Sequence, residues 1–473
     1  MRVPTQSAVA EQSVVAVKSV KTDGAKRLHC LALTIGQQFV FFEGGTDGQG
    51  RTEKGMSMKR KQCCISKQGV LEAYKQVKRN KGAAGVDSQT IDEFEENLED
   101  NLYKIWNRMS SGAYFPPPVR AVVIPKDNGK ERLLGIPTVE DRVAQTVIKI
   151  CLEPLVEPHF HPDSYGYRPN KSAIDAIGTA RKKCWDYDWV VDLDIKGFFD
   201  NLDHSLVMQL VKKYTDDRLV LLYIERWLKA QAQLADGTLV TRNKGTPQGG
   251  VISPLLANIF LHTAFDSWMG DKFSTLPFER YADDGIVHCK TEKQAKFVRS
   301  CIEKQLKKWK LELHPEKTKI VYCKDDDRAG KYPNEKFDFL GYTFRARCSK
   351  NKWGKYFINF SPAVSDKAKK SITQAMRRWK VHLRSDKNLE DIAHMFNPII
   401  RGWINYYGKF YKSALYPVFR HFNCTLSRWV ERKYKRFRNH SRRAKYWLGL
   451  IARREPSLFA HWSLLGIIPS VGQ

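Results

Sequence analysis

One short segment constrains the fold more than any other, because it sets carboxylates on a strand that otherwise belongs in a core. Residues 189–195 read Trp-Val-Val-Asp-Leu-Asp-Ile. Side chains alternate along a strand, so Leu193 and Ile195 share one face, and Asp192 and Asp194 share the other. Carboxylates beside a hydrophobic core are unfavourable unless a metal ion or another cation accompanies them. The segment therefore predicts a core strand that presents acids to a cationic site.

A second acidic motif lies further along the chain, where residues 281–284 read Tyr-Ala-Asp-Asp at a tight turn between short strands. Adjacent carboxylates at a hairpin tip repel each other unless cations lie between them. Two metal ions that clamp an attacking hydroxyl and a leaving phosphate need carboxylates from separate strands. Magnesium prefers oxygen ligands and commonly shares its coordination sphere with substrate phosphates. We therefore predict that Asp194, Asp283 and Asp284 hold two Mg2+ ions, with Mn2+ as a substitute, rather than being solvated surface acids.

The net charge indicates the class of partner. Lys and Arg number 80 against 51 Asp and Glu, a formal net charge of +29, which is expected to attract a polyanion such as nucleic acid. A membrane surface is the weaker alternative, because no apolar stretch approaches the roughly eighteen residues of a spanning helix. The N-terminus lacks the apolar core and cleavage site of a secretory signal. We expect a cytoplasmic protein without a membrane partner.

Apolar spacing predicts the alternating helices and strands of an α+β fold. A hairpin is expected over residues 120–137, with Asn128 and Gly129 at its turn, and a helix should begin near Thr138. After residue 361 the pattern is helical and increasingly basic. The other expected elements are helices from 68, over 91–109 and over 292–309, and strands over 189–195, 281–289, 319–323 and 337–344.

The motifs together resemble the reverse transcriptases encoded within bacterial group II introns. Residues 194–200 read Asp-Ile-Lys-Gly-Phe-Phe-Asp, and residues 245–250 read Gly-Thr-Pro-Gln-Gly-Gly. These motifs precede residues 281–284 in the order that is found in this family. The resemblance covers roughly residues 65–462, including the motifs at 124–126, 135–137, 164–169, 337–342 and 401–407.

The resemblance implies a right-hand polymerase that synthesises DNA on an RNA template, assists splicing of its host intron and carries out intron mobility (retrohoming) by target-primed reverse transcription. Its implied partners are the group II intron RNA, an RNA template, a DNA primer or target and deoxynucleoside triphosphates, and a dimer is one option. No cysteine pair has the spacing of a zinc site, so we expect no H-N-H endonuclease domain. The expected domains are an N-terminal extension at 1–58, fingers and palm at 59–345, an α-helical thumb or maturase X domain at 346–427, and a basic DNA-binding region at 428–473. Disorder is one alternative for the N-terminal extension.

The resemblance also assigns nucleotide-binding roles. Lys126 and Arg132 flank the turn of the predicted hairpin and are expected to contact the triphosphate, although an ordinary exposed hairpin is the alternative. Gln248 is expected to line the nucleotide pocket, beside glycines that let the backbone approach a substrate; a turn without a ligand is the alternative. Phe199 is expected to be the aromatic that excludes a ribose 2′-hydroxyl, because alternation leaves Phe198 in the core.

Further residues are candidates for nucleic-acid contact. Arg168 is a candidate template contact, with a solvated or structural cation as the alternative. The hairpin around Gly341 is expected to seat the primer end, with a core strand as the alternative. Trp403 and Tyr407, four residues apart on one helix face, are expected to be buried. The basic region has eleven Lys or Arg and one acid over residues 428–454. Its cations and interleaved aromatics predict nucleic-acid contact, with a solvated surface as the alternative. Those aromatics are Trp429, Tyr434, Phe437, Tyr446 and Trp447. The basic candidates are Arg428, Arg432, Lys433, Lys435, Arg436, Arg438, Arg442 and Arg443.

Three other functions stay open at this point. A splicing-only maturase with a decayed polymerase is disfavoured by the intact Asp194, Asp283 and Asp284, because decay should first remove such costly carboxylates. A free-standing reverse transcriptase in phage defence or array acquisition is disfavoured by the maturase-like and basic regions. An RNA-templated RNA polymerase is disfavoured by the aromatic at position 199.

Overall fold

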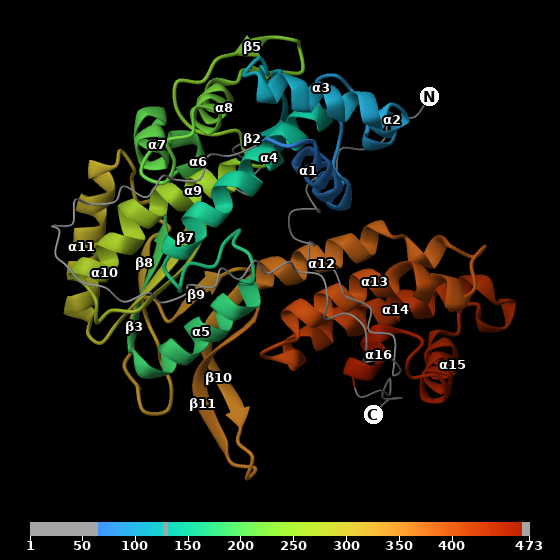
Figure 1. Ribbon diagram of the computed structural model, residues 1–473. Coiled ribbons are helices and arrows are strands. Elements are labelled where there is room, and N and C mark those ends of the chain that lie inside the picture. The colour runs from blue at the N-terminus through green and yellow to red at the C-terminus, as the bar shows by residue number, and fades with distance from the viewer. Residues whose placement is uncertain (1–64, 126–130, 466–473) are drawn as a thin grey trace, which may run out of the picture.

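The described part of the chain combines helices and strands in an α+β fold. The computed structural model describes residues 65–125 and 131–465, so the expected N-terminal extension at 1–58 lies outside the described residues. The described strands form three sheets, in the orders β2-β1-β4-β5, β6-β7-β3-β8 and β11-β10-β9. Figure 1 shows the first helices at one end and the last helices gathered to one side of the sheets. Within the described ranges, every helix is too short or too polar to span a lipid bilayer.

The N-terminal helices form because their apolar residues recur on one face. The expected helix from residue 68 is α1, and it buries Val70, Ala73, Tyr74 and Val77, as the spacing predicts. The helix expected over 91–109 is divided in two at Asn97, whose φ of −125° is not helical. The bounds are α1 (Lys67–Asn80), α2 (Ile91–Glu96) and α3 (Leu98–Ser110).

The expected hairpin is confirmed as β1 and β2, which pair antiparallel with Arg120 opposite Ile136. β1 also pairs in parallel with β4, which in turn pairs with β5. The next helix begins as expected, because the Thr138 side chain accepts a hydrogen bond from the Asp141 backbone and caps α4. The bounds are β1 (Val119–Pro125), β2 (Glu131–Ile136), α4 (Val139–Val156), β4 (Ala232–Gln233) and β5 (Leu239–Val240).

A four-stranded antiparallel sheet, called the central sheet below, lies between the two largest hydrophobic cores. Its strand β3 buries Val191 and Leu193 in one large core. The opposite face of the same sheet buries Val190 and Ile286 in a second core. The strand bounds are β3 (Trp189–Asp194), β6 (Phe278–Tyr281), β7 (Asp284–Cys289) and β8 (Lys319–Tyr322). The helices and turns between α4 and β8 are η1 (Glu157–His159), α5 (Ala173–Asp186), α6 (Phe198–Asn201), α7 (His204–Val211), α8 (Arg218–Lys229), α9 (Ser253–Leu261), the π-helical turn η2 (His262–Asp266), α10 (Ser267–Lys272) and α11 (Glu292–Lys308).

The C-terminal part joins a three-stranded sheet to a group of helices through the second core. β10 extends well past the strand expected to end at 344, and β11 is a strand that the sequence pattern did not predict. The expected domain boundaries after residues 345 and 427 fall inside β10 and α14. The bounds are β9 (Lys336–Phe339), β10 (Tyr342–Lys350), β11 (Tyr356–Val364), α12 (Asp366–Arg378), η3 (Val381–Leu383), α13 (Leu389–Tyr407), η4 (Lys412–Leu415), α14 (Tyr416–Lys433), η5 (Lys435–Phe437), α15 (Ser441–Arg454) and α16 (Ala460–Leu464).

Candidate active site

The central sheet brings the three predicted aspartates together. β3 and β7 pair antiparallel with Asp194 opposite Asp284. β6 and β7 are joined by a two-residue turn that holds Asp283, since Tyr281 pairs with Asp284 across it. Asp192 and Asp194 are half-buried on one face of β3, while the alternate residues are in the core. The predicted alternation is confirmed, and the carboxylates meet at one edge of the sheet.

These carboxylates create a region of concentrated negative charge. Burial, followed by the charges of Asp284 and Asp194, raises the pKa of Asp192 to about 8. Asp284 keeps an exposed surface, yet the surrounding protein and the charges of Asp283 and Asp194 raise its pKa to about 7. The Nζ atom of Lys317 lies 3.0 Å from Oδ2 of Asp194 and partly offsets this charge. Such mutual repulsion favours binding of a further cation.

The available ligand atoms fit a metal ion whose coordination shell is completed by the substrate. Among residues 65–125 and 131–465, no group of three or more His, Cys, Asp or Glu side chains forms a ready-made metal cage. The carboxylates of Asp194, Asp283 and Asp284 nonetheless supply only oxygen atoms, which Mg2+ prefers, and substrate phosphates and water commonly complete its octahedron.

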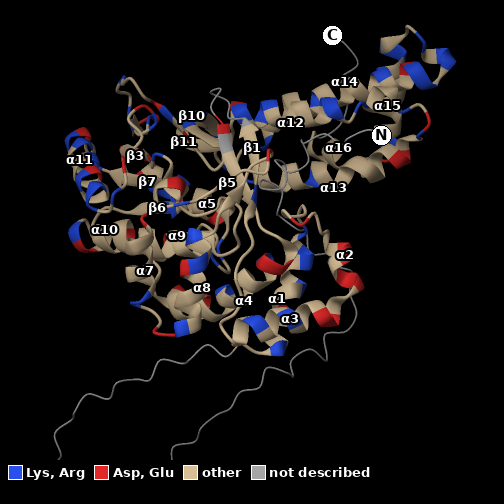
Figure 2. Ribbon diagram, turned by 90° about the horizontal axis from the view of Figure 1, so that it is seen from above, with Lys and Arg blue, Asp and Glu red and all other residues tan. Residues whose placement is uncertain are grey.

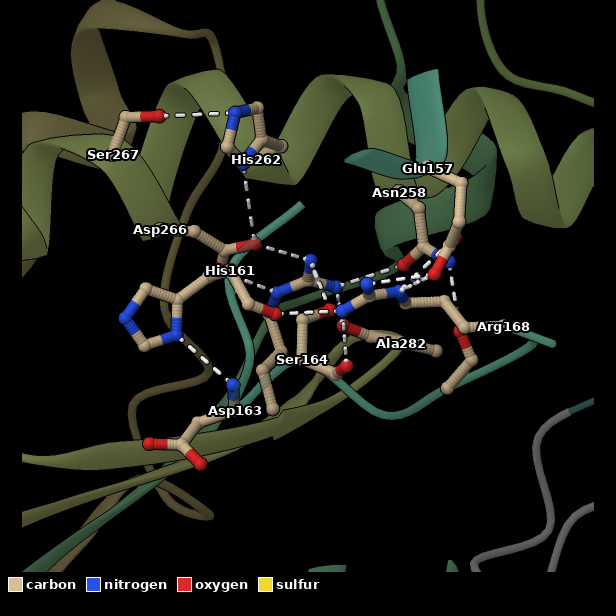
Figure 3. Close-up of polar contacts among 12 residues, drawn as sticks. Glu157, His161, Asp163, Ser164, Arg168, Asn258, His262, Asp266, Ser267 and Ala282 are labelled. Carbon is tan, nitrogen blue, oxygen red and sulfur yellow. Dashed lines mark hydrogen bonds and ion pairs between the residues drawn. The ribbon is translucent and has the colours of Figure 1, made fainter. Parts of the chain in front are cut away.

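The buried Arg280 holds the acidic turn in place. Figure 3 labels the four residues that accept its hydrogen bonds, Ser164, Asn258, Asp266 and Ala282. The Nε and Nη2 atoms of Arg280 donate to the two carboxylate oxygens of Asp266 at 2.7 and 2.6 Å. Nη1 donates to the carbonyl of Ala282 and to Oδ1 of Asn258, both at 3.0 Å. Nη2 also donates to Oγ of Ser164 at 2.8 Å. The guanidinium therefore ties the turn to helix α9, to η2 and to the loop before α5.

The backbone of the turn depends on this support. Ala282 has a φ of +56°, a left-handed conformation that residues other than glycine rarely adopt. Gly166 packs directly against it, because a Cβ there would lie 2.4 Å from the Ala282 nitrogen. Nδ2 of Asn258 donates to the Gly166 carbonyl at 2.7 Å. Strained backbone of this kind persists where neighbouring contacts hold it.

Sequence reasoning assigned no role to this network, although one signal was present. Asn258 is a polar residue that is fully buried within the apolar helix α9. Asp266 ends the π-helical turn η2, a rare geometry that often occurs at functional sites. Buried polar groups need hydrogen-bond partners, so Asn258 could have indicated a network, but not which residues complete it.

The loop of residues 245–250 links the β1–β2 hairpin to the short helix α6. The carbonyl of Gln248 accepts a hydrogen bond from the Gly135 nitrogen on β2 at 2.8 Å. Its Nε2 atom donates to Oδ1 of Asp200 at 2.9 Å. Gly249 has a φ of +122°, and a Cβ there would lie 2.4 Å from the Gly135 carbonyl oxygen. The structure thus sets Gln248 between β2 and α6.

Phe199 lies beside this loop, although not for the reason that the sequence suggested. Gly197 has a φ of +56°, and the chain then enters the short helix α6, so strand alternation does not apply. Phe198 is nevertheless buried and Phe199 half-buried. Lys126 lies outside the described residues. Arg132 lies on β2 opposite Ile124, and its side chain is also outside the described part.

The expected template contact of Arg168 is wrong, because its guanidinium is used inside the protein. Nη2 donates to Oε1 of Glu157 at 2.7 Å. Nη1 donates to the carbonyls of His161 and Ser164 at 2.6 and 2.7 Å. The side chain is 6% exposed. Arg168 therefore secures the loop that packs against the acidic turn.

The hairpin turn at Gly341 packs against helix α13. Leu340 and Gly341 have φ values of +51° and +80°, which suits a two-residue turn between β9 and β10. A Cβ at Gly341 would lie 3.2 Å from the Tyr407 hydroxyl, and the Tyr406 hydroxyl donates to the Leu340 carbonyl at 2.9 Å. Tyr407 is buried as predicted, whereas Trp403 is half-buried.

The expected stacking role of the C-terminal aromatics is wrong for two of them. Trp429 and Phe437 are buried in the second core, whereas Tyr446 is 51% exposed. Lys433 is half-buried, and its Nζ atom donates to the carbonyls of Ser385 and Lys387. Figure 2 shows Lys and Arg spread along α12, α14 and α15. The exposed candidates are Arg428, Arg432, Lys435, Arg436, Arg438, Arg442 and Arg443.

Carboxylates on adjacent strands of one sheet, together with the loop of residues 245–250 and a basic helical region in the same chain, are the arrangement expected of a nucleic-acid polymerase. Comparison with protein families agrees with this class. Residues 124–344 match a family model described as reverse transcriptase (RNA-dependent DNA polymerase). Residues 369–447 match the maturase-specific domain of group II introns.

Relatives identify the family. The chain is 30% identical over 426 residues to the group II intron-encoded protein LtrA of Lactococcus lactis subsp. cremoris, covering 71% of this chain and 68% of that protein. It is 30% identical over 360 residues to protein YkfC of Escherichia coli (strain K12), covering 67% of this chain and 90% of YkfC. It is 27% identical over 276 residues to the putative COX1/OXI3 intron 1 protein of Saccharomyces cerevisiae, covering 57% of this chain and 32% of that protein.

The chain belongs to the group II intron-encoded reverse transcriptases. It is an RNA-directed DNA polymerase that assists splicing and binds intron RNA. Enzymes of the reverse transcriptase family generally use divalent metal ions.

Proposed function

We propose that Asp194, Asp283 and Asp284 are the catalytic residues for DNA synthesis, with Mg2+ as the natural metal and Mn2+ as a substitute. The observation that carries this proposal is the strand register that sets Asp194 opposite Asp284, next to the turn that holds Asp283. In the reaction, the primer 3′-oxygen attacks the α-phosphorus of a deoxynucleoside triphosphate, and pyrophosphate leaves. Bound magnesium would neutralise charge that develops on the phosphate oxygens.

The protein's own groups prepare this centre. The three carboxylates would hold the metal ions, and Lys317 places a positive charge 3.0 Å from Asp194. The Arg280 guanidinium keeps the turn in its left-handed conformation through the Ala282 carbonyl. Preorganised charge of this kind needs little rearrangement during the reaction.

The nucleotide pocket is proposed to lie between β2, α6 and the loop of residues 245–250. Lys126 and Arg132 would contact the triphosphate, and Gln248 would line the pocket. Phe199 would exclude a ribose 2′-hydroxyl by steric contact. The hydrogen bond from the Gly135 nitrogen to the Gln248 carbonyl supports this assembly, because it fixes the loop against the same strand that carries Arg132.

The test is primer extension on an RNA template by the full chain. Asp194→Asn should reduce extension by several orders of magnitude while the protein stays folded, because losing one metal carboxylate removes several kcal/mol of charge stabilisation. Asp188→Asn is the matched control, since this partly exposed acid lies just before the other end of β3 and pairs with Arg328. Equal activity of the two variants would refute the assignment.

Residues 346–427, which include the outer part of β10, β11 and the helices that follow, are proposed to act as thumb and maturase X domain. The basic region at 428–473 is proposed to bind target DNA during retrohoming. The turn at Gly341 is proposed to seat the primer end. Support comes from the maturase-specific match over residues 369–447 and from the exposed cations of α14, η5 and α15. This match favours the intron context over a free-standing reverse transcriptase.

A charge variant tests the DNA grip better than a truncation, because Trp429 is part of the core. Replacing Arg436, Arg438, Arg442 and Arg443 with Gln should weaken binding of duplex DNA. The slope of log K against log salt should also become shallower by about one for each phosphate contact that is lost. Primer extension on a short template should change little. The control replaces four exposed lysines on α11 with Gln, namely Lys293, Lys296, Lys304 and Lys308. The same slope for both variants would contradict the proposal.

A further inference from the structure

The strands β10 and β11 continue beyond their sheet as a two-stranded arm, which projects from the molecule in Figure 1. β9 pairs with the first part of β10, as far as Arg345. From there to the pair Lys350–Tyr356, β10 pairs with β11 alone among the described strands. The reverse transcriptase match ends at residue 344 and the maturase match begins at residue 369. The arm therefore lies in the interval that neither family model covers.

The base of the arm is fixed to the body of the protein. Phe344 and Phe360 are fully buried in the second core. Nε1 of Trp185 donates to the Phe360 carbonyl at 3.0 Å. The Ile358 nitrogen donates to Oδ2 of Asp326 at 2.9 Å. These contacts hold the arm in a set direction, so its tip is presented on a stable support.

The tip itself carries aromatic rings and positive charge without an acid. Residues 345–358 contain five Lys or Arg and no Asp or Glu. Trp353 is 78% exposed and Tyr356 is 67% exposed. The Nζ atom of Lys352 lies 4.3 Å from the centre of the Trp353 ring, and that of Lys350 lies 5.4 Å from the Tyr356 ring. Exposed large aromatics gathered in one place mark interaction sites.

The tip also lies far from the proposed catalytic centre. β10 begins directly after the Leu340–Gly341 turn, which is proposed to seat the primer end. From Tyr342 to Lys350 the strand rises by roughly 26 Å. A ligand bound to the tip therefore lies on a different surface from a primer end bound at the catalytic aspartates.

We propose that the arm tip, residues 350–356, binds an unpaired segment of RNA. Bases would stack on Trp353 and Tyr356, and phosphates would lie against Lys350, Lys352 and Lys355. Unpaired nucleotides match both the aromatic rings and the lysines, because every base has a π-face that can stack and every phosphate linkage carries a negative charge. Intron RNA offers such segments in its loops and bulges. The inference extends the RNA binding of this family to a new surface and does not depend on the metal assignment.

Binding of a labelled single-stranded RNA of mixed sequence tests the proposal. The full chain is first saturated with an RNA–DNA primer–template duplex, so that the polymerase cleft is filled, and RNA binding is then followed by fluorescence anisotropy. Trp353→Ala should weaken binding roughly 5- to 150-fold, and Trp353→Phe should restore most of the affinity. Changing Lys350, Lys352 and Lys355 to Gln should make the slope of log K against log salt shallower by about two.

Two controls separate this surface from others. Phe297→Ala removes an aromatic that is 61% exposed on α11 and should leave the affinity unchanged. RNA containing 4-thiouridine should crosslink to residues 350–356. Unaltered affinity of Trp353→Ala, or crosslinks confined to other segments, would overturn the proposal. If Trp353→Ala keeps its RNA affinity but no longer binds anionic phospholipid vesicles, the tip binds a membrane instead. If it keeps its RNA affinity but loses self-association in ultracentrifugation, the tip binds a second copy of the chain.

Discussion

Neutralising Asp266 should disable the enzyme without any change to the catalytic aspartates. In Asp266→Asn, the Arg280 guanidinium stays buried but loses the carboxylate that accepts two of its hydrogen bonds. Removing one partner of a buried ion pair costs about 3 to 5 kcal/mol, because the remaining charge is left without compensation. The free energy of unfolding, measured with urea, should fall by about that amount.

The catalytic effect should exceed what lost stability explains. Arg280 also donates to the Ala282 carbonyl, so a guanidinium that shifts will release the turn that carries Asp283 and Asp284. A misplacement of about 1 Å lowers a rate on the order of 100-fold. We expect kcat per active site, titrated with a primer–template burst, to fall by this order, while KM for the nucleotide changes less than about threefold.

A surface ion pair provides the control. Glu225→Gln breaks the exposed contact with Lys229, in which the two atoms are 2.6 Å apart, and exposed pairs contribute about 0 to 1 kcal/mol. It should leave stability and kcat nearly unchanged. An Asp266→Asn protein that matches this control in both measurements would refute the positioning role of the buried network.

Three further changes test other parts of the structure. Phe199→Ala should raise ribonucleotide incorporation at least tenfold in single-nucleotide extension, and an unchanged sugar preference would reject the gate. Gly166→Ala sets a Cβ 2.4 Å from the Ala282 nitrogen, so extension should be lost although the protein still folds by circular dichroism; normal activity would show that the turn tolerates movement. His461 is fully buried, and burial lowers its pKa from 6.5 to about 3. Its contribution to stability is therefore full above pH 6.5 and decreases as the pH falls towards 3. Between pH 7.5 and 5.0 the wild type should lose about 2 kcal/mol of unfolding free energy relative to His461→Gln; an identical pH dependence of the two proteins would contradict the assignment.

The parts of the fold that follow from local periodicity could be predicted. The spacing of apolar residues in α1 and the alternation in β3 each determine which face is buried, and both predictions are confirmed. The joint position of Asp194 and Asp284 could also be inferred, because such carboxylates are too costly for an ordinary core strand. The break at Asn97 could not, since an amphipathic pattern continues across it.

Features that depend on distant partners could not be predicted. Arg280 and Ser164 form a hydrogen bond although they are 116 residues apart, and Arg168 pairs with Glu157 through a loop. Trp429 has the same sequence context whether it packs in a core or stacks on a base, and only the tertiary structure decides. β11 was not predicted because apolar residues occupy both the exposed and the half-buried positions of its outer part, Tyr356, Phe357 and Ile358, so no alternation of polar and apolar residues marks the strand.

The most direct test of the whole account is one protein, Asp283→Asn, assayed in parallel for primer extension on an RNA template and for splicing of its intron RNA. The account predicts that extension is lost in Mg2+ and in Mn2+, because a catalytic carboxylate is missing. It also predicts that splicing assistance is retained, because RNA binding uses other surfaces. Extension at the wild-type rate would contradict the assignment of the catalytic centre.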